Sequence, residues 1–150
     1  MTFRTESRLT IAGSVADVWA YLSDVGRWPE WAPTVLEAWI RDGAPFGAGA
    51  RVEQRAKGIF GSSRRRSQEV TVAETPRRMA FAGPLGTSSA RWGMELESLA
   101  EDRTDAEMWI EVDLEGPMRA IPSGMLQRRI QRVSDLEMTL IKAAVESDAP

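Results

Sequence analysis

The longest helical pattern of this sequence occupies residues 122–147, PSGMLQRRIQRVSDLEMTLIKAAVES. At about 100° per residue its apolar side chains fall on a single arc of a helix. These side chains are Leu126, Ile130, Val133, Leu136, Leu140, Ile141 and Ala144. A long amphipathic helix must bury such an arc against another layer. No other predicted element is long enough to cover a sheet, so this helix decides the architecture.

The residues before this helix alternate with a period of two, as strands with one buried face do. The pattern predicts strands at 3–11, 34–41, 50–57, 65–74, 79–83, 88–99 and 105–115. Residues 14–24 predict a short amphipathic helix that begins at Ser14, and 27–31 predict a second small helical turn. The fold class is therefore α+β. We expect one domain over residues 1–150, with a twisted seven-stranded antiparallel sheet curled around the C-terminal helix.

Composition excludes several classes of chemistry. Histidine and cysteine are both absent, which excludes Ser-His-Asp triads, thiolate nucleophiles and metal sites built on these side chains. The chain has 17 Arg and 2 Lys but a net charge of −3, which gives no bulk basicity for nucleic acid. No apolar run has the length of a signal peptide or membrane span. We expect a soluble, cytoplasmic protein with no metal, no cofactor and no integral membrane association; a homodimer is left open.

Three stretches resemble one known family. They are VWAYLSD (18–24) with WPEW (28–31), VTVAETPRRM (70–79), and the helix end at 135–146. Together they resemble the polyketide cyclase/dehydrase branch of the START/Bet v 1-like (SRPBCC) superfamily, over nearly the whole chain. The resemblance implies the helix-grip fold, with a deep hydrophobic cavity between the sheet and the C-terminal helix. It also implies activities such as aldol cyclisation and dehydration of poly-β-ketone chains.

Aromatic and methionine side chains are the main candidates for lining such a cavity, because they suit flat or flexible apolar ligands. The alternative is an ordinary core. The candidate ligand-binding residues are Trp28, Trp31, Trp39, Phe46, Phe60, Gln68, Phe81, Trp92, Met94, Met108, Ile110, Met118, Ile121, Met125 and Arg129. We expect Phe46 and Phe60, in glycine-bounded loops, at the cavity entrance. Trp19 is expected in the core and Trp109 on the wet face of the sheet.

Few polar side chains are placed to act on a ligand. If Val70 and Val72 face inward, Gln68 and Arg66 follow the same phase, although a solvated strand end is the alternative. Arg129 lies inside the apolar arc of the long helix and Glu137 at its edge. An enclosed charge must be paired, reach the rim or face a wet cavity. Arg129, Arg66 and Tyr21, the only phenol, are the candidate catalytic residues.

Three functions remain open. The first is binding of a hydrophobic small molecule such as a lipid, isoprenoid, polyketide or aromatic metabolite. The second is a polyketide cyclase/dehydrase that polarises a ketone without metal or cofactor. The third is a protein-interaction module centred on Phe46, Phe60 and Trp109. Many functions share one scaffold, so the fold alone does not choose among them.

Overall fold

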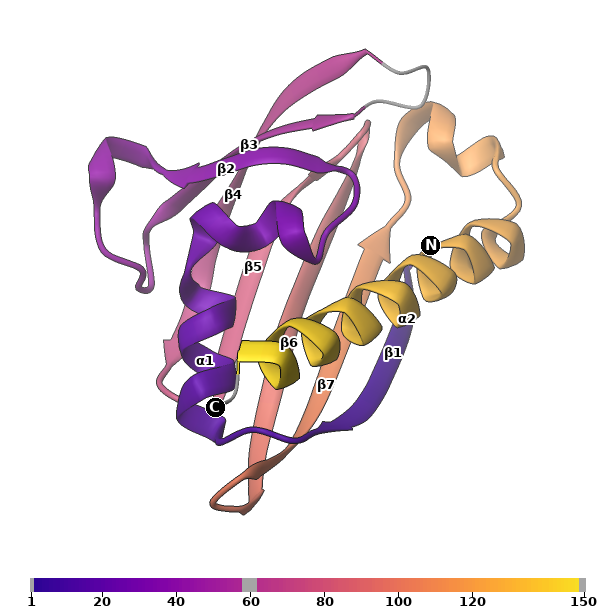
Figure 1. The fold of residues 1–150 in the computed structure, drawn as a ribbon. Coiled ribbons are helices and arrows are strands. Elements are labelled where there is room, and N and C mark those ends of the chain that lie inside the picture. Colours follow the sequence, from indigo (N-terminus) through magenta and orange to yellow (C-terminus); the bar gives the residue numbers. More distant parts are fainter. Residues whose placement is uncertain (1, 58–61, 149–150) are drawn as a thin grey trace.

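The computed structural model describes residues 2–57 and 62–148. Seven strands form one antiparallel sheet in the order β1-β7-β6-β5-β4-β3-β2, crossed by a long C-terminal helix (Figure 1). The strands are β1 (Thr2–Ile11), β2 (Val35–Ile40), β3 (Arg51–Lys57), β4 (Ser63–Glu74), β5 (Arg78–Leu85), β6 (Ser88–Ala100) and β7 (Arg103–Asp113). The helices are α1 (Val15–Ser23) and α2 (Ser123–Asp148), with short 3-10 helices η1 (Val25–Glu30), η2 (Arg41–Gly43) and η3 (Gly116–Ala120). The predicted α+β helix-grip fold is confirmed.

Helix α2 packs along the edge strand β1. The side-chain amides of Gln127 and Gln131 donate hydrogen bonds to the backbone carbonyls of Arg4 (3.4 Å) and Glu6 (2.8 Å). Its buried side consists of Ser134, Met138, Ile141 and Val145. The free backbone groups of an edge strand invite pairing with other chains, so this cover protects the sheet as well as burying apolar surface.

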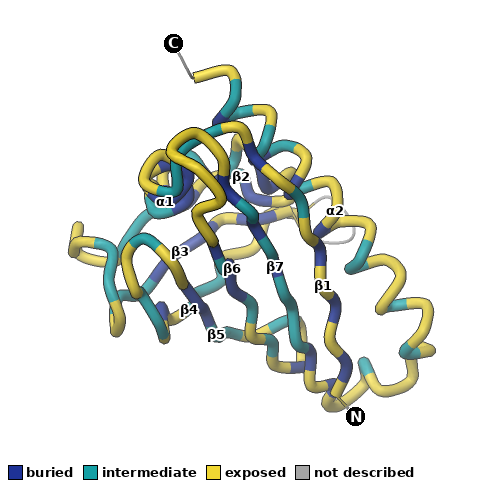
Figure 2. Tube along the Cα trace, turned by 90° about the horizontal axis from the view of Figure 1, so that it is seen from below, coloured by how far each residue is buried: buried dark blue, intermediate teal, exposed yellow. Residues whose placement is uncertain are grey.

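Helix α1 and η1 lie beside the C-terminal end of α2 (Figures 1 and 2). The Ser14 hydroxyl accepts a hydrogen bond from the backbone N–H of Asp17 at 3.1 Å, which caps α1 as predicted. The end of α2 is held there by polar contacts. Arg27 pairs with Asp148 at 3.1 Å, and the backbone N–H of Ala12 donates to Glu146 at 2.9 Å. None of the described helices is long and apolar enough to span a membrane.

The inward phase of β4 changes at a bulge. The register shifts between Val70 and Val72, so Val70 pairs with Phe81 and Ala73 with Met79. Gln68 and Arg66 keep the phase of the buried Val70, whereas Val72 takes the outer face. The expectation that Val70 and Val72 share one face is therefore wrong, because a bulge adds one residue to the strand.

Strand β5 is longer than predicted. The predicted turn covers Gly83-Pro84-Leu85-Gly86, but the pairing of β5 with β6 continues to Leu85. Of these four residues only Gly86 lies in the turn, and its φ of 61° falls in the left-handed region that favours glycine. In this hairpin the Gly83-Pro84 pair does not mark the turn. The turn lies at Gly86, the glycine with a positive φ.

Gly93 lies on the outer face of the sheet, where neighbouring atoms leave no room for a side chain. A Cβ atom there would lie 2.6 Å from the Met79 carbonyl oxygen and 2.8 Å from Trp109 Cζ2. Trp109 covers this glycine on the outer face, as expected, with the Arg4 guanidinium 5.0 Å from its ring. Because residue 93 has no side chain, the Trp109 ring can pack directly on the sheet at this point.

We expect Gly93→Ala to lower the free energy of unfolding by about 1–3 kcal/mol, because backbone and indole must both move aside. Gly124→Ala, in the first turn of α2, is the matched control: a Cβ there meets nothing within 4 Å. Urea unfolding of both variants measures the difference. If the two variants are equally stable, Trp109 and β5 move aside for the added methyl group without loss of folding free energy, and the prediction is wrong.

Candidate functional site

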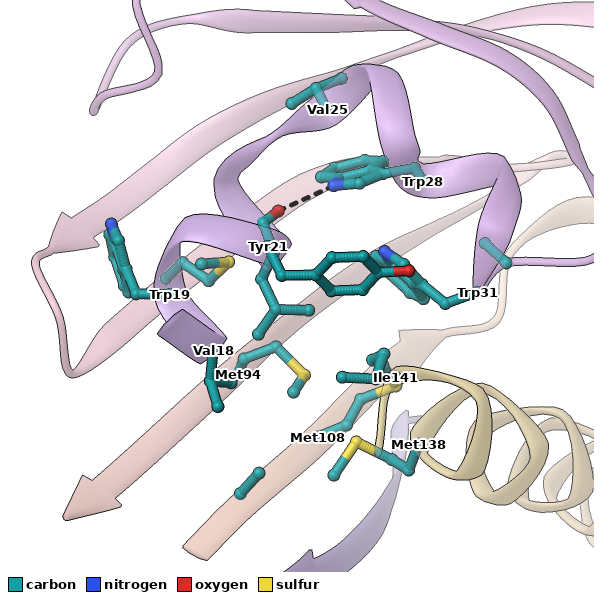
Figure 3. Close-up of a cluster of buried hydrophobic side chains, with 14 of the residues drawn as sticks. Val18, Trp19, Tyr21, Val25, Trp28, Trp31, Met94, Met108, Met138 and Ile141 are labelled. Atoms are coloured by element: carbon teal, nitrogen blue, oxygen red, sulfur yellow. Dashed lines mark hydrogen bonds between the residues drawn. The ribbon is translucent and has the colours of Figure 1, made fainter. Parts of the chain in front are cut away.

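Five aromatic side chains meet in the interior beneath η1; we call Trp28, Trp31, Phe46, Phe81 and Trp92 the aromatic cluster. Phe81 and Trp92 stack with centroids 4.2 Å apart and 16° between planes, and Trp28 meets Phe81 edge-on at 5.3 Å. The Trp28 indole N–H donates to the Leu22 carbonyl at 2.9 Å (Figure 3). The cluster therefore ties α1 and η1 to the middle of the sheet.

Much of the expected cavity lining is closed core. Trp28, Phe81, Met94 and Met108 are at most 2% exposed. A side chain that lined a water-sized cavity would keep accessible surface against it. The expectation that these four line an open cavity is corrected, because their side chains are almost completely enclosed by neighbouring atoms. Trp92 and Ile110, on the inner face of the sheet, are half-buried rather than fully enclosed.

Four polar side chains face the interior next to this cluster; we call Gln54, Arg66, Gln68 and Glu137 the interior polar group. Arg66 Nε donates to Gln54 Oε1 at 2.8 Å, and the Trp92 indole N–H donates to Gln68 Oε1 at 2.6 Å. The β3–β4 register places Gln54 opposite Arg66 and the buried Val52 opposite Gln68. Neighbouring strands thus bring their polar side chains to the face that α2 covers.

Glu137 and Arg66 interact across the interior. Burial raises the pKa of Glu137 from its usual 4.5 to about 7, and the nearby Arg66 charge opposes that rise. Burial likewise lowers the pKa of Arg66, and Glu137 opposes this. None of the ion pairs between described residues joins the two directly. Near neutral pH the Glu137 carboxyl is therefore about half protonated. Its negative charge then balances only part of the positive charge of the Arg66 guanidinium.

Among the buried side-chain donors without a partner in the described residues, Trp31 is the one that belongs to the aromatic cluster. The indole N–H of Trp31 is buried and has no hydrogen-bond partner among the described residues. Trp31 is 3% exposed, and its ring centroid lies 6.4 Å from that of Trp92. A buried donor without a partner costs about 1–3 kcal/mol, so this N–H gains from any acceptor that reaches it.

Two of the candidate catalytic residues do not reach this site. Tyr21 is buried, but its hydroxyl donates to Glu30 at 3.3 Å and the Arg27 guanidinium covers its ring at 4.7 Å. Burial and then Glu30 raise the pKa of Tyr21 to about 12. Arg129 is exposed on α2, so it does not join the enclosed polar groups. Of the three candidates, the structure brings only Arg66 into the interior polar group.

Several expected lining residues lie elsewhere. Trp39 pairs with Glu53 on the outer face of the sheet, where the Arg65 guanidinium lies 5.3 Å from its ring. Its expected place in the cavity is wrong, because strand alternation turns it away from its inward neighbours. Met118 is half-buried against the smaller apolar cluster near η3, while Ile121 and Met125 are exposed at the start of α2.

Phe46 is part of the core rather than a free loop tip. Its ring meets Trp19 edge-on at 6.1 Å and Phe81 at 6.0 Å. Trp19 is buried, as expected. Phe60 lies outside the described residues. Because Phe46 packs inside and Trp109 lies on the outer face, these two residues do not form one partner surface, which removes the basis of the interaction-module hypothesis.

Sequence reasoning missed Gln54. A signal was available, because Gln54 falls between Val52 and Ala56 on the apolar phase of its strand. A polar residue in such a phase requires a partner, and the structure supplies Arg66. The sequence left open whether Glu137 faces the cavity or is paired at its rim. Its electrostatic interaction with Arg66 connects α2 with β4, and no pattern of neighbouring residues predicts an interaction between such distant segments.

The comparisons with known proteins agree with this geometry. A family model described as polyketide cyclase / dehydrase and lipid transport matches residues 2–146. No curated protein matches the sequence significantly. Among solved structures, a START superfamily protein from Mycobacterium smegmatis superposes with a TM-score of 0.79 at 17% identity, covering 97% of this chain and 99% of that one.

Two aromatase/cyclases share the fold. The two-domain aromatase/cyclase StfQ of the steffimycin pathway gives a TM-score of 0.80 at 17% identity, with 99% of this chain and 52% of that chain covered. The Zhui aromatase/cyclase from a Streptomyces species gives 0.75 at 14% identity, with 97% and 94% covered. The family match over nearly the whole chain shows that this protein belongs to the polyketide cyclase/dehydrase and lipid-transport family.

Proposed function

We propose that this chain binds an apolar small molecule that carries a carbonyl, hydroxyl or carboxyl group, with that oxygen beside Arg66. The observation that carries the proposal is the enclosed guanidinium of Arg66, which faces Glu137 without a direct ion pair. Lipids, isoprenoids, polyketides and aromatic metabolites all fit this description, in keeping with the family.

The hydrogen-bond inventory of Arg66 supports a polar ligand atom. A guanidinium has five N–H donors, and the contact with Gln54 uses the one on Nε. An enclosed charge with unused donors is costly. A ligand oxygen would accept from the terminal nitrogens and recover part of that cost. A carboxylate would gain most, since charge-assisted hydrogen bonds are the stronger kind.

The apolar part of the ligand has a matching surface. Trp92 and Ile110 are half-buried on the inner face of the sheet. The unused indole N–H of Trp31 adjoins Trp92 and offers a second anchor for a ligand oxygen. Burial of a ring or chain here is worth about 25 cal/mol for each Å² removed from water.

Native mass spectrometry of freshly purified protein, followed by tryptophan-fluorescence titration, tests the proposal. Medium-chain fatty acids and aromatic polyketides should shift or quench the emission, since Trp31 and Trp92 lie at the expected site. The same compounds with the oxygen group replaced by a methyl should bind more weakly. Absence of any spectral change with all of these compounds would exclude the proposed site.

Glu137 supports cyclisation and dehydration as a second candidate function. A carboxyl whose pKa is about 7 can give and take protons near neutral pH, and it faces a cation able to polarise a ketone. In this scheme Glu137 removes a proton from carbon between two ketones, and Arg66 stabilises the developing enolate oxygen. The enolate carbon then attacks another ketone of the chain, and the Glu137 carboxyl gives its proton to the new alkoxide oxygen. In the dehydration the Glu137 carboxylate removes the second proton of the same carbon and passes it to the departing hydroxyl, which leaves as water.

A linear poly-β-ketone analogue separates the two functions. Turnover that Glu137→Gln abolishes while binding persists supports catalysis, since glutamine keeps the size but cannot carry the proton. Binding without turnover by the unmodified protein leaves the chain a carrier. Mass spectrometry of the products, which detects loss of water, gives the measurement.

A further inference from the structure

The charges of this chain are segregated. Residues 116–134, which form η3 and the first half of α2, contain no Asp or Glu and four arginines: Arg119, Arg128, Arg129 and Arg132. The chain has 19 basic and 22 acidic residues, so the rest of it holds 15 basic and 22 acidic, a net charge of −7. The overall charge of −3 therefore conceals one strongly basic segment on an acidic protein.

The four arginines are free to meet an external partner. All four are exposed, and none makes a hydrogen bond, ion pair or ring contact with another described residue. Several arginines on the exposed face of the sheet are neutralised instead: Arg4 and Arg91, for example, both pair with Glu111. A run of unpaired arginines on one element points to an anionic partner outside the chain.

Apolar side chains are exposed in the same place. Ile121, Met125, Val133 and Leu136 are 37%, 57%, 38% and 49% exposed, and they are four of the five large apolar side chains with such exposure among the described residues. Exposed apolar groups gathered on one element, rather than scattered singly, indicate an interaction site.

Helical spacing interleaves the two kinds of side chain. Met125, Arg129, Arg132 and Leu136 follow one another at intervals of four, three and four residues, so they share one face of α2. The face toward the sheet is different, since it contains Ser134, Met138 and Ile141. We call the exposed face, together with Arg119, Ile121 and Arg128, the α2 surface. An open hollow of about 340 Å³, lined by Arg119, Ile121 and Ser123 among others, continues it at the helix start.

We propose that the α2 surface docks this protein on an anionic lipid bilayer. A helix with arginines beside exposed apolar side chains lies in the plane of a membrane interface, with its apolar groups in the headgroup boundary and its cations on the phosphates. The apolar groups favour a bilayer over a purely polar polyanion. The acidic remainder of the chain favours one orientation, because a net charge of −7 is repelled by the same membrane.

The position of the α2 surface connects it to the interior. Val133 and Leu136 precede Glu137 on the same helix, so a docked molecule holds the accessible part of its interior close to the lipid. An apolar ligand could then pass between bilayer and protein with little exposure to water. The docking itself rests on the α2 surface alone, and it holds whether or not the interior binds a ligand.

Vesicle flotation tests the docking. Vesicles of phosphatidylcholine with about 30 mol% phosphatidylglycerol should bind the protein, vesicles of phosphatidylcholine alone should not, and added salt should weaken binding. Arg129→Gln with Arg132→Gln should weaken binding about 30-fold, at about 1 kcal/mol for each arginine. Leu136→Ser should also weaken it, without loss of stability, because that side chain is half exposed.

Arg77→Gln with Arg103→Gln is the matched control. These two arginines are also exposed and unpaired among the described residues, and they lie at turns of the sheet away from η3 (Figure 1). This double variant has the same net charge as the first and should keep its vesicle binding. Equal loss in both double variants would overturn the proposal. So would failure of the unmodified protein to float with anionic vesicles, or binding to duplex DNA without binding to vesicles.

Discussion

Replacing Arg66 by methionine is expected to weaken binding of an oxygen-bearing apolar ligand by about 100-fold. Hydrogen bonds to a charged group in an enclosed site contribute about 1.5–3 kcal/mol, and methionine keeps much of the volume while removing every donor. The free energy of unfolding should not fall, because folding no longer has to bury a guanidinium. Tryptophan-fluorescence titration measures the affinity, and urea unfolding measures the stability.

Arg65→Met is the control for this variant. Arg65 is the next residue on β4 and carries the same charge, but it lies on the outer face over Trp39. We expect it to leave ligand affinity unchanged. If both variants bind equally well, the guanidinium of Arg66 is a structural group and not a ligand anchor.

Glu137→Gln is expected to stabilise the protein by about 3 kcal/mol above pH 7. The pKa of this carboxyl is about 7 in the folded protein and near the usual 4.5 in the unfolded chain. Between these values the folded protein holds a proton that the unfolded chain has released. Stability therefore falls as pH rises from about 4.5 to about 7, by about 1.4 kcal/mol for each unit of difference. Glutamine does not titrate and removes this loss.

The pH dependence of the difference between variant and unmodified protein is the decisive measurement. Below about pH 4.5 the carboxyl is neutral in both states, so the two proteins should be nearly equally stable. The difference should grow up to about pH 7 and then stay constant. Glu101→Gln, at an exposed site in the β6–β7 turn, is the control for the loss of one negative charge. A difference that instead favours the unmodified protein at high pH would mean that Arg66 holds Glu137 ionised.

Local patterns predicted most of the elements. Strand alternation identified the inward phase of β6 and β7, and helical spacing identified α2. These patterns succeed because burial of one face imposes its period on consecutive residues. Trp109 was placed outward correctly for the same reason. The predicted apolar arc of α2 is wrong in part, because Val133 and Leu136 are exposed and the buried side contains Ser134, Met138, Ile141 and Val145. The errors at Val72 and Pro84 arose where a bulge and a late turn interrupted that period.

The candidate site was only partly predictable. For Arg66 and Gln68 the sequence left two places open, an inward position in phase with Val70 and a solvated strand end, and the structure places both inside. Tyr21 and Arg129 are candidates because of their chemistry, but neither contacts the site. The Tyr21 side chain contacts Glu30 and Arg27, and Arg129 is exposed to solvent. Trp28 and Phe81 were expected to line a cavity, yet packing closes the space around them.

The sequence by itself determined the α+β fold, the single long helix and the basic, apolar character of the α2 surface, since each depends on residues close together in the chain. Only the tertiary structure decided which charged groups meet inside. The relation of Glu137 to Arg66 depends on the register of β3 with β4 and on how α2 lies along β1. Those placements join segments far apart in the sequence. No local period carries that information.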